Sequence, residues 1–385
     1  MRRSTGLVVL GLALAFEASA HARGRAPAAV QPAESSVVAY VVVDADSGAV
    51  LAEKEQHKKW PPASMTKMMT VLLAMERVKS GAARLEEPVH ASAWASKIGG
   101  SQVYLKAGET FPLGEMLKAI MIASANDAAV AVAEHLAGSQ AAFVEKMNQR
   151  AAELGLTDTT YQTPHGLPPG KGQLPDISSA HDLAVLGREL MKYPEVMKWA
   201  ATPQAGFRDD TLQMSNTNHL VRGMYPGATG LKTGYYVQAG FEITATATRN
   251  DFNLLAVVLG VPDKKASFAE AARLLNEAFA SQRAFVATRR GAVVGKVPVS
   301  GGGVESVDAI ATRDLRLVVA AGDEKSVTVE PHFTTDLAAP VEKDQALGEV
   351  IVKRAGVEVG RVPVVAAAAV EPSGWMARIK SRAGR

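Results

Sequence analysis

Ser64 and Lys67 stand three positions apart, and their side chains could together perform nucleophilic chemistry. If a helix begins at Ser64, the two side chains lie on one face, one turn apart, so that the lysine amine reaches the serine hydroxyl. A serine hydroxyl is a poor nucleophile until a base takes its proton, and an amine held uncharged is one such base. The spacing therefore predicts a serine nucleophile paired with a lysine general base.

The surrounding segment favours a buried helix that starts at the serine. Pro61 and Pro62 restrict the helix to the residues that follow them, and the run from Met65 to Met75 is apolar on almost every side. A helix start also offers free N–H groups and a positive dipole end to a developing negative charge. The alternative is a serine N-cap followed by a solvated lysine. Taken alone, Ser-x-x-Lys favours this alternative.

Two further motifs change that balance. Ser124-Ala125-Asn126 follows, and then Lys232-Thr233-Gly234, and each of the three patterns occurs once in the chain. Ser-x-x-Lys, Ser-x-Asn and Lys-Thr-Gly in this order are typical of penicillin-recognising serine enzymes. Ser124 would relay a proton to a leaving amine, and Asn126 would hold a substrate amide.

The third motif suits a substrate that ends in a free carboxylate. Lys232 offers a positive charge, Thr233 offers a hydroxyl, and Gly234 lets a substrate backbone approach the strand. The N–H groups of Ser64 and Tyr235 could form an oxyanion hole, worth about 3 kcal/mol per donor.

Lys67 must be uncharged to act as a base. Burial and the nearby charge of Lys232 would both lower the pKa of Lys67. We therefore expect Lys67→Arg to be inactive.

The composition narrows the function classes. The chain has 385 residues, a net charge of +3 and no cysteine. Disulfides, cysteine–zinc sites and thiol catalysis are excluded, and the slight charge supports neither nucleic-acid binding nor an acidic partner. We expect no metal and no cofactor.

Both ends of the chain predict a location outside the cytoplasmic membrane. Arg2 and Arg3 precede an apolar run and small residues, which predicts a signal peptide over residues 1–22, cleaved after Ala20 or Ala22. An uncleaved anchor is the alternative. Residues 23–35 are expected to be a flexible linker. The basic tail, 369–385, contains a tryptophan and favours contact with an anionic membrane surface, although a disordered tail explains it equally well.

The order of elements predicts an α+β fold. Strands near residues 37–53 are followed by a helical region, further strands over 229–261 and a closing helix over 266–282, which favours an antiparallel sheet with helices on both faces. This catalytic domain is expected to span 36–288. Short valine-rich runs over 289–368 predict a small all-β domain.

Four segments together resemble the serine-type D-alanyl-D-alanine carboxypeptidases, which are low-molecular-mass penicillin-binding proteins. These segments are Pro62–Lys67, Ser124–Ala128, Thr163–Leu167 and Gly230–Tyr235. The resemblance implies a β-lactamase/transpeptidase-like fold, with Ser64 as the acylated nucleophile, Lys67 as the base and Ser124 as the relay. It also implies that Lys232 and Thr233 bind the substrate carboxylate, with the Tyr235 N–H in the oxyanion hole.

The implied enzyme is exported to the periplasm. It removes the terminal D-alanine from peptidoglycan stem pentapeptides and is covalently inhibited by penicillins. Two positions depart from the family pattern: Tyr236 replaces a common threonine, and Ser267 replaces a common arginine. His165 is interpreted as a structural or rim residue, because Lys67 already supplies the base.

Three other functions remain open for the same site. A D,D-endopeptidase would cut cross-links with it, and a β-lactamase would use the same motifs, although no Glu-x-x-Leu-Asn segment is present. A catalytically idle wall-binding protein would keep the fold without the reaction.

Overall fold

The computed structural model describes Met1 and residues 36–374. The predicted signal peptide and linker, apart from Met1, lie outside the described residues, as does the basic tail from residue 375 onward. Within the described part, no helix is both long and apolar enough to cross a membrane.

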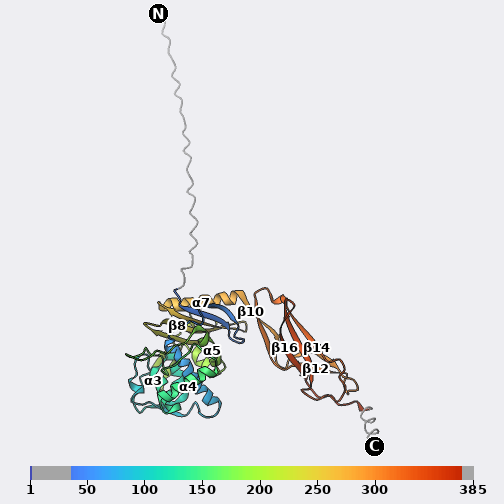
Figure 1. Cartoon of the computed structure of the whole chain (residues 1–385), viewed down its shortest axis with the longest axis horizontal. Coiled ribbons are helices and arrows are strands. Elements are labelled where there is room, and N and C mark those ends of the chain that lie inside the picture. Colours follow the sequence, from blue (N-terminus) through green and yellow to red (C-terminus); the bar gives the residue numbers. More distant parts are fainter. Residues whose placement is uncertain (2–35, 375–385) are drawn as a thin grey trace. The chain divides into compact units, whose positions relative to one another are not determined.

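A five-stranded antiparallel sheet organises the first part of the described chain (Figure 1). Its strands lie in the order β2 (Val50–Lys54), β1 (Ala39–Asp44), β9 (Phe252–Val261), β8 (Gly240–Arg249) and β7 (Ala228–Tyr236). The hairpin predicted at Asn250-Asp251 joins β8 to β9, and both residues have positive φ, as the tightest hairpin turns require. β7, which carries Lys-Thr-Gly, lies at the edge of the sheet.

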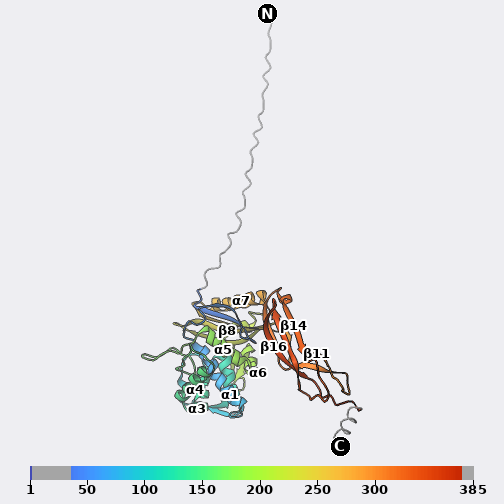
Figure 2. The same ribbon diagram turned by 45° about the vertical axis from the view of Figure 1, so that its right-hand side comes forward.

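Helices cover both faces of this sheet, as predicted. The helix α7 (Lys264–Ser281) packs on one face of the sheet (Figure 2). Its Phe268 and Leu275 belong to the same apolar core as buried side chains of β8 and β9. The helices α1 (Lys67–Lys79) and α5 (Ala180–Met191) belong to the larger core on the other face.

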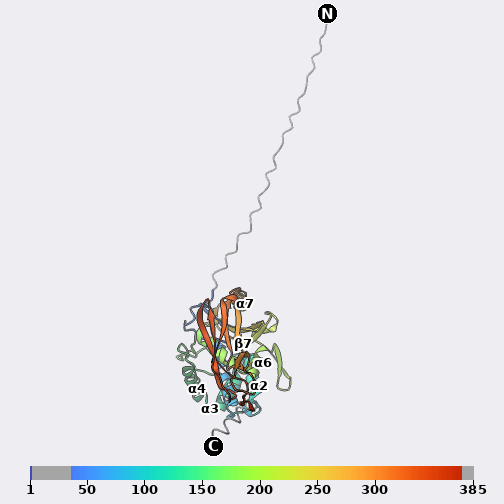
Figure 3. The ribbon, with the colours of Figure 1, turned by 90° about the vertical axis from the view of Figure 1, so that its right-hand side faces the viewer.

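The helical region between β2 and β7 contains most of the other helices. They are α2 (Leu113–Ala123), α3 (Asn126–Ala137), α4 (Gln140–Glu153) and α6 (Pro194–Ala201), the last of which contacts β7 (Figure 3). Short elements connect them: β3 (Pro88–His90), β4 (Thr110–Pro112), β5 (Gln204–Phe207), β6 (Leu212–Ser215), η1 (Ala63–Thr66), η2 (Ala95–Lys97) and η3 (His219–Arg222).

The last part of the described chain is all β, apart from the single turn η4 (Glu324–Ser326). One sheet has the order β11 (Val293–Pro298), β12 (Ser306–Ala311), β16 (Val357–Ala366), β15 (Ala346–Arg354) and β14 (Val327–Phe333). A smaller sheet pairs β10 (Gln282–Thr288) with β13 (Leu315–Ala320). The valine-rich runs thus form an all-β unit with its own core; the exact boundary at residue 288 remains a prediction.

Candidate active site

Ser64 lies in a turn of 3-10 helix and not, as the sequence suggested, at the start of an α-helix. The 3-10 turn η1 covers residues 63–66, and α1 begins only at Lys67. Ala63 has a φ of 44°, a left-handed conformation that follows directly on the double proline. A 3-10 helix has three residues per turn, so positions i and i+3 lie above one another. The tighter turn therefore still brings Ser64 and Lys67 together.

Lys67 is fully buried, and its Nζ lies 2.9 Å from Ser64 Oγ. Burial, followed by the charge of Lys232, lowers the pKa of Lys67 well below its usual range. Lys67 Nζ also donates a 2.6 Å hydrogen bond to the carbonyl of His165. An uncharged amine has one lone pair, so this bond leaves the lone pair free to accept the Ser64 proton.

The loop after α4 holds the nucleophile turn in place through its backbone. The Thr70 hydroxyl donates to the Pro164 carbonyl at 2.6 Å, next to the His165 carbonyl that receives Lys67. Gly166 packs so closely that a Cβ there would lie 1.8 Å from the Ala63 carbonyl oxygen. The side chain of His165 is buried, and burial lowers its pKa to about 3, so the ring stays neutral. The segment from Pro164 to Gly166 therefore positions Lys67 through backbone carbonyls and not through the His165 ring.

Ser124 lies between α2 and α3 in a left-handed conformation, with a φ of 60°. Next to it, Asn126 donates from Nδ2 to the Gly99 carbonyl at 2.7 Å, while its buried Oδ1 has no partner among residues 36–374. Asp127 fixes the neighbouring loop because its carboxylate accepts the N–H groups of Val103 and Leu105. The connection thus presents a hydroxyl and a free amide oxygen from a rigid mount.

Lys232 joins the third motif to the second. Its Nζ donates to Ser124 Oγ at 2.8 Å and to the Thr233 carbonyl at 3.0 Å, and burial lowers its pKa to about 7. Thr233 Oγ1 donates to Thr217 Oγ1 at 2.7 Å. The second and third motifs, 108 positions apart at Ser124 and Lys232, are therefore in direct contact.

A cavity of about 220 Å³ opens between these segments. Of the predicted site residues, five line it: Ser64, Ser124, Thr233, Gly234 and Tyr235. Lys67, Asn126 and Lys232 are not part of its lining; the two lysines lie behind Ser64 and Ser124 and reach the cavity through those hydroxyls.

Seven further residues line the cavity, and of these only Ser267 was singled out from the sequence, as a departure from the family pattern. They are Ser101, Thr217, Phe241, Glu242, Lys264, Ser267 and Phe268. Glu242 could have been suspected, because it is an isolated acidic residue at the start of an apolar strand. Thr217 and Lys264 gave no such signal, because only the tertiary fold brings them to the serine.

Glu242 is almost fully buried, and neither of its carboxyl oxygens has a hydrogen-bond partner in the described part of the chain. It lies opposite Gly234 in the β7–β8 register. Burial raises its pKa well above the usual range for a glutamic acid. The folded protein therefore keeps this proton to a higher pH than the unfolded chain does.

We expect Glu242→Gln to flatten the pH dependence of stability. The proton bound by folded Glu242 makes the wild type lose stability as the pH rises above the unfolded-state pKa, by about a factor of ten in the unfolding equilibrium constant per pH unit. Urea unfolding of both proteins from about pH 5 to about pH 8 measures this slope. Glu53→Gln, at an exposed position of β2, is the control. Parallel curves for the wild type and Glu242→Gln would mean that Glu242 is already ionised in the folded state.

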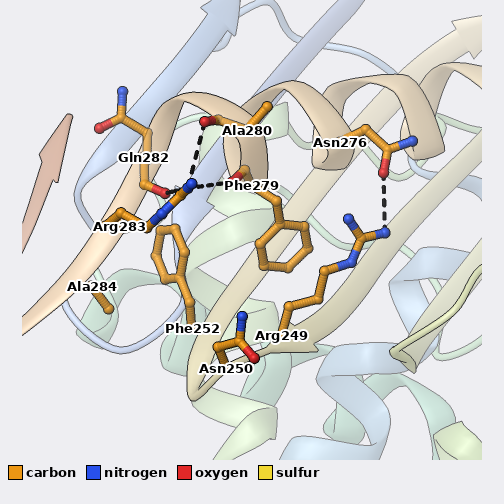
Figure 4. A pocket seen from close by; sticks show the side chains of 9 residues that line it. All are labelled: Arg249, Asn250, Phe252, Asn276, Phe279, Ala280, Gln282, Arg283 and Ala284. Atoms are coloured by element: carbon orange, nitrogen blue, oxygen red, sulfur yellow. Dashed lines mark hydrogen bonds between the residues drawn. The ribbon is translucent and has the colours of Figure 1, made fainter. Parts of the chain in front are cut away.

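A second cavity, of about 460 Å³, lies at the end of α7 and shares no residue with the first (Figure 4). Its two arginines bind groups of the chain itself. Arg249 donates to Asn276 Oδ1 at 3.0 Å, and Arg283 donates to the Phe279 carbonyl at 2.6 Å. Arg283 therefore caps the helix, and we assign this cavity a structural role.

The first cavity is suited to acyl transfer. It combines a partly buried hydroxyl, a buried amine of lowered pKa and a second hydroxyl that bridges to a second amine. These are the parts of a serine enzyme that works through a covalent intermediate. Among residues 36–374, no group of three or more His, Asp or Glu side chains could hold a metal ion.

Comparison of the sequence with known protein families identifies the class of serine enzyme. The family model described as D-alanyl-D-alanine carboxypeptidase matches residues 26–263, and that described as penicillin-binding protein 5, C-terminal domain, matches residues 286–372. The chain belongs to the D-alanyl-D-alanine carboxypeptidase family. The carboxypeptidase DacF of Bacillus subtilis (strain 168) is 34% identical to it, over 100% of this chain and 98% of DacF.

Solved structures agree with this assignment. Penicillin-binding protein 5 from Haemophilus influenzae superposes with a TM-score of 0.71 at 29% identity, covering 89% of this chain and 99% of that chain. Penicillin-binding protein D2 from Listeria monocytogenes, in its ampicillin-bound form, superposes with a TM-score of 0.58 at 27% identity, covering 64% of this chain and 98% of that chain. The predicted transpeptidase-like fold with a late β domain is thus confirmed.

Proposed function

We propose that this chain removes the terminal D-alanine from peptidoglycan pentapeptides through an acyl-enzyme on Ser64. The chain is a serine-type D-alanyl-D-alanine carboxypeptidase by family, and the roles of its residues are our assignment. The single observation that supports these roles most is the contact of Ser64 Oγ with the fully buried Lys67 amine at 2.9 Å.

Acylation begins when Ser64 Oγ attacks the carbonyl carbon of the penultimate D-alanine. The Ser64 proton passes to the lone pair of Lys67 Nζ, which the His165 carbonyl orients. The N–H groups of Ser64 and Tyr235 stabilise the oxyanion that forms. The carbon–nitrogen bond then breaks, and the proton held by Lys67 passes through Ser124 Oγ to the leaving D-alanine amine, which leaves Lys67 uncharged again. In the second half-reaction Lys67 takes a proton from the water that attacks the ester. As the ester bond breaks, Lys67 returns this proton to Ser64 Oγ, and the shortened peptide leaves with its new carboxylate.

The substrate is held by groups at the two sides of the serine. Thr233, together with Lys232 behind Ser124, binds the terminal carboxylate, and Gly234 lets the peptide backbone lie along the edge strand β7. Asn126 also lies outside the cavity lining, and we assign its unpartnered Oδ1 to a substrate N–H. No partner other than the peptide is required for the reaction.

β-Lactams are the expected covalent inhibitors. They present a strained acyl group and a carboxylate to the same serine, and the ampicillin-bound relative supports this expectation. A slowly hydrolysed penicilloyl ester on Ser64 would separate a carboxypeptidase from a β-lactamase, which clears the ester quickly.

The decisive experiment incubates the purified protein with diacyl-Lys-D-Ala-D-Ala and follows free D-alanine by mass spectrometry. We expect release that is blocked by prior incubation with benzylpenicillin, together with a mass increase of the protein equal to one penicillin. A folded protein that is labelled by penicillin but releases no D-alanine from this peptide or from a pentapeptide would contradict the proposed activity. Cleavage of cross-linked dimers alone would identify a D,D-endopeptidase.

We also propose that the enzyme acts in the periplasm, on the outer face of the cytoplasmic membrane. The basic start and apolar run of residues 1–22, and the basic tail that ends the sequence, support export and a peripheral membrane contact. Fractionation of cells that produce the full chain, with and without residues 375–385, tests both points. Recovery of the uncleaved chain in the cytoplasm would contradict export.

A further inference from the structure

The active-site cavity contains a lysine whose charge the proposed reaction does not yet use. Lys264, the first residue of α7, lines the same cavity as Ser64 and Thr233 and is exposed to solvent. No ion pair or side-chain hydrogen bond of Lys264 is found among residues 36–374. Its charge acts on His219, whose pKa is lowered by burial and then by Lys264. Its N-cap neighbour Asp263 is engaged by the N–H of Ala266 at 2.8 Å.

The other charged groups near the cavity cannot supply a permanent positive charge. Lys232 is 1% exposed, is bonded to Ser124 and Thr233, and has a pKa of about 7, so it is only partly charged at neutral pH. Glu242 is an acid, so it offers no positive charge, and burial raises its pKa and disfavours its charged form. Lys264 is therefore the one basic side chain in the lining.

The cavity that Lys264 lines also contains the hydroxyls of Thr217, Thr233 and Ser267. Thr233 Oγ1 donates to Thr217 Oγ1, so the Thr217 proton is free to point at a ligand. Ser267, one turn after Lys264, is 2% exposed, and its hydroxyl donates to the Lys264 carbonyl at 2.8 Å. The Ser267 hydroxyl is thus used within α7, and its small side chain leaves space in the cavity that a larger side chain would fill. A flexible lysine stem can place its ammonium in that space.

We propose that Lys264 is the residue that makes this site prefer substrates with a free terminal carboxylate, acting together with the Thr217–Thr233 hydroxyl pair. This inference rests on the proposed function, because it concerns the carboxylate end of the same substrate. Since Lys264 is exposed, its contribution is moderate and screened by salt.

The test compares acids with uncharged analogues. Lys264→Ala, Lys264→Glu and Lys264→Arg are assayed with diacyl-Lys-D-Ala-D-Ala and with its C-terminal amide. We expect Lys264→Ala to raise KM for the acid about tenfold with kcat nearly unchanged, Lys264→Glu to raise it further, and Lys264→Arg to restore it. The preference for the acid over the amide falls by the same factor. Lys265→Glu, at the next exposed position of α7, is the matched control and keeps the wild-type preference.

A second readout separates this proposal from the proposed function. Acylation of Ser64 by benzylpenicillin and by its methyl ester measures the same preference without any release of D-alanine. If the wild type releases no D-alanine but Lys264→Ala loses the acid-over-ester preference, the proposed activity fails and the role of Lys264 stands. If folded Lys264→Ala and Lys264→Glu keep the wild-type preference for both pairs of compounds, the role of Lys264 is refuted.

Discussion

Replacing Ser64 with alanine is expected to abolish D-alanine release and covalent labelling by penicillin together. The alanine variant has no side-chain oxygen at position 64 that can attack the substrate carbonyl, and Ser124, the other serine assigned to the reaction, is bonded to Lys232 and not to Lys67. Loss of a serine nucleophile typically lowers kcat on the order of 10⁴-fold or more. The measurements are D-alanine release and the mass of the protein after incubation with benzylpenicillin.

The same variant should still fold and still bind. Ser64 Oγ contributes one side-chain contact, to Lys67, so the thermal midpoint should change little. Ser80→Ala, at the exposed position directly after α1, is the matched control and should retain full activity. Penicillin labelling of the Ser64→Ala protein at the wild-type rate would place the nucleophile elsewhere.

The Lys67→Arg variant is expected to lose acylation by about 10²- to 10⁴-fold, the range typical of a missing general base. A guanidinium stays charged at any pH of interest and has no lone pair that could accept the Ser64 proton. The second-order rate of labelling by a fluorescent penicillin measures the loss. In the wild type, this rate should fall as the pH drops through the lowered pKa of Lys67, because protonation removes the base. The Lys67→Arg variant should not show this fall in the acylation rate at low pH.

Burial makes a second variant necessary, because an arginine in the place of a fully buried lysine could disturb packing. Lys67→Met keeps the length of the side chain without charge, and we expect it to be as inactive as Lys67→Arg while remaining folded. Lys79→Arg, at the other end of α1, should behave as the wild type. A folded Lys67→Met or Lys67→Arg protein with near wild-type labelling would remove Lys67 from the mechanism.

The sequence was informative where chemistry depends on short spacing. Ser64 and Lys67 are three residues apart, so any right-handed helical turn brings them together, and the finding of a 3-10 turn did not disturb the prediction. The strand pattern and the Asn250-Asp251 turn were equally local signals, and they placed β7 to β9 correctly. The contact of Lys232 with Ser124 followed from family motifs and not from spacing, because the two are 108 positions apart.

Contacts made by the backbone could not be predicted. The His165 carbonyl, and not its imidazole, meets Lys67, and Gly166 matters because it leaves space for the Ala63 carbonyl. The residue types at positions 165 and 166 do not reveal such backbone contacts. Lys264 and Thr217 reach the cavity only because α7 and the segment before β7 pack beside the edge of the sheet, which depends on the whole core.

The depth of the two lysines has a consequence for chemical probes. Lys67 and Lys232 are 0% and 1% exposed, and their lowered pKa values leave more of each amine in the reactive, unprotonated form than at an ordinary surface lysine. Bulky amine-directed reagents will modify the surface and spare both residues. A compact bifunctional electrophile that first esterifies Ser64 could then be captured by the Lys67 amine 2.9 Å away, which would turn a slowly reversible adduct into a permanent cross-bridge.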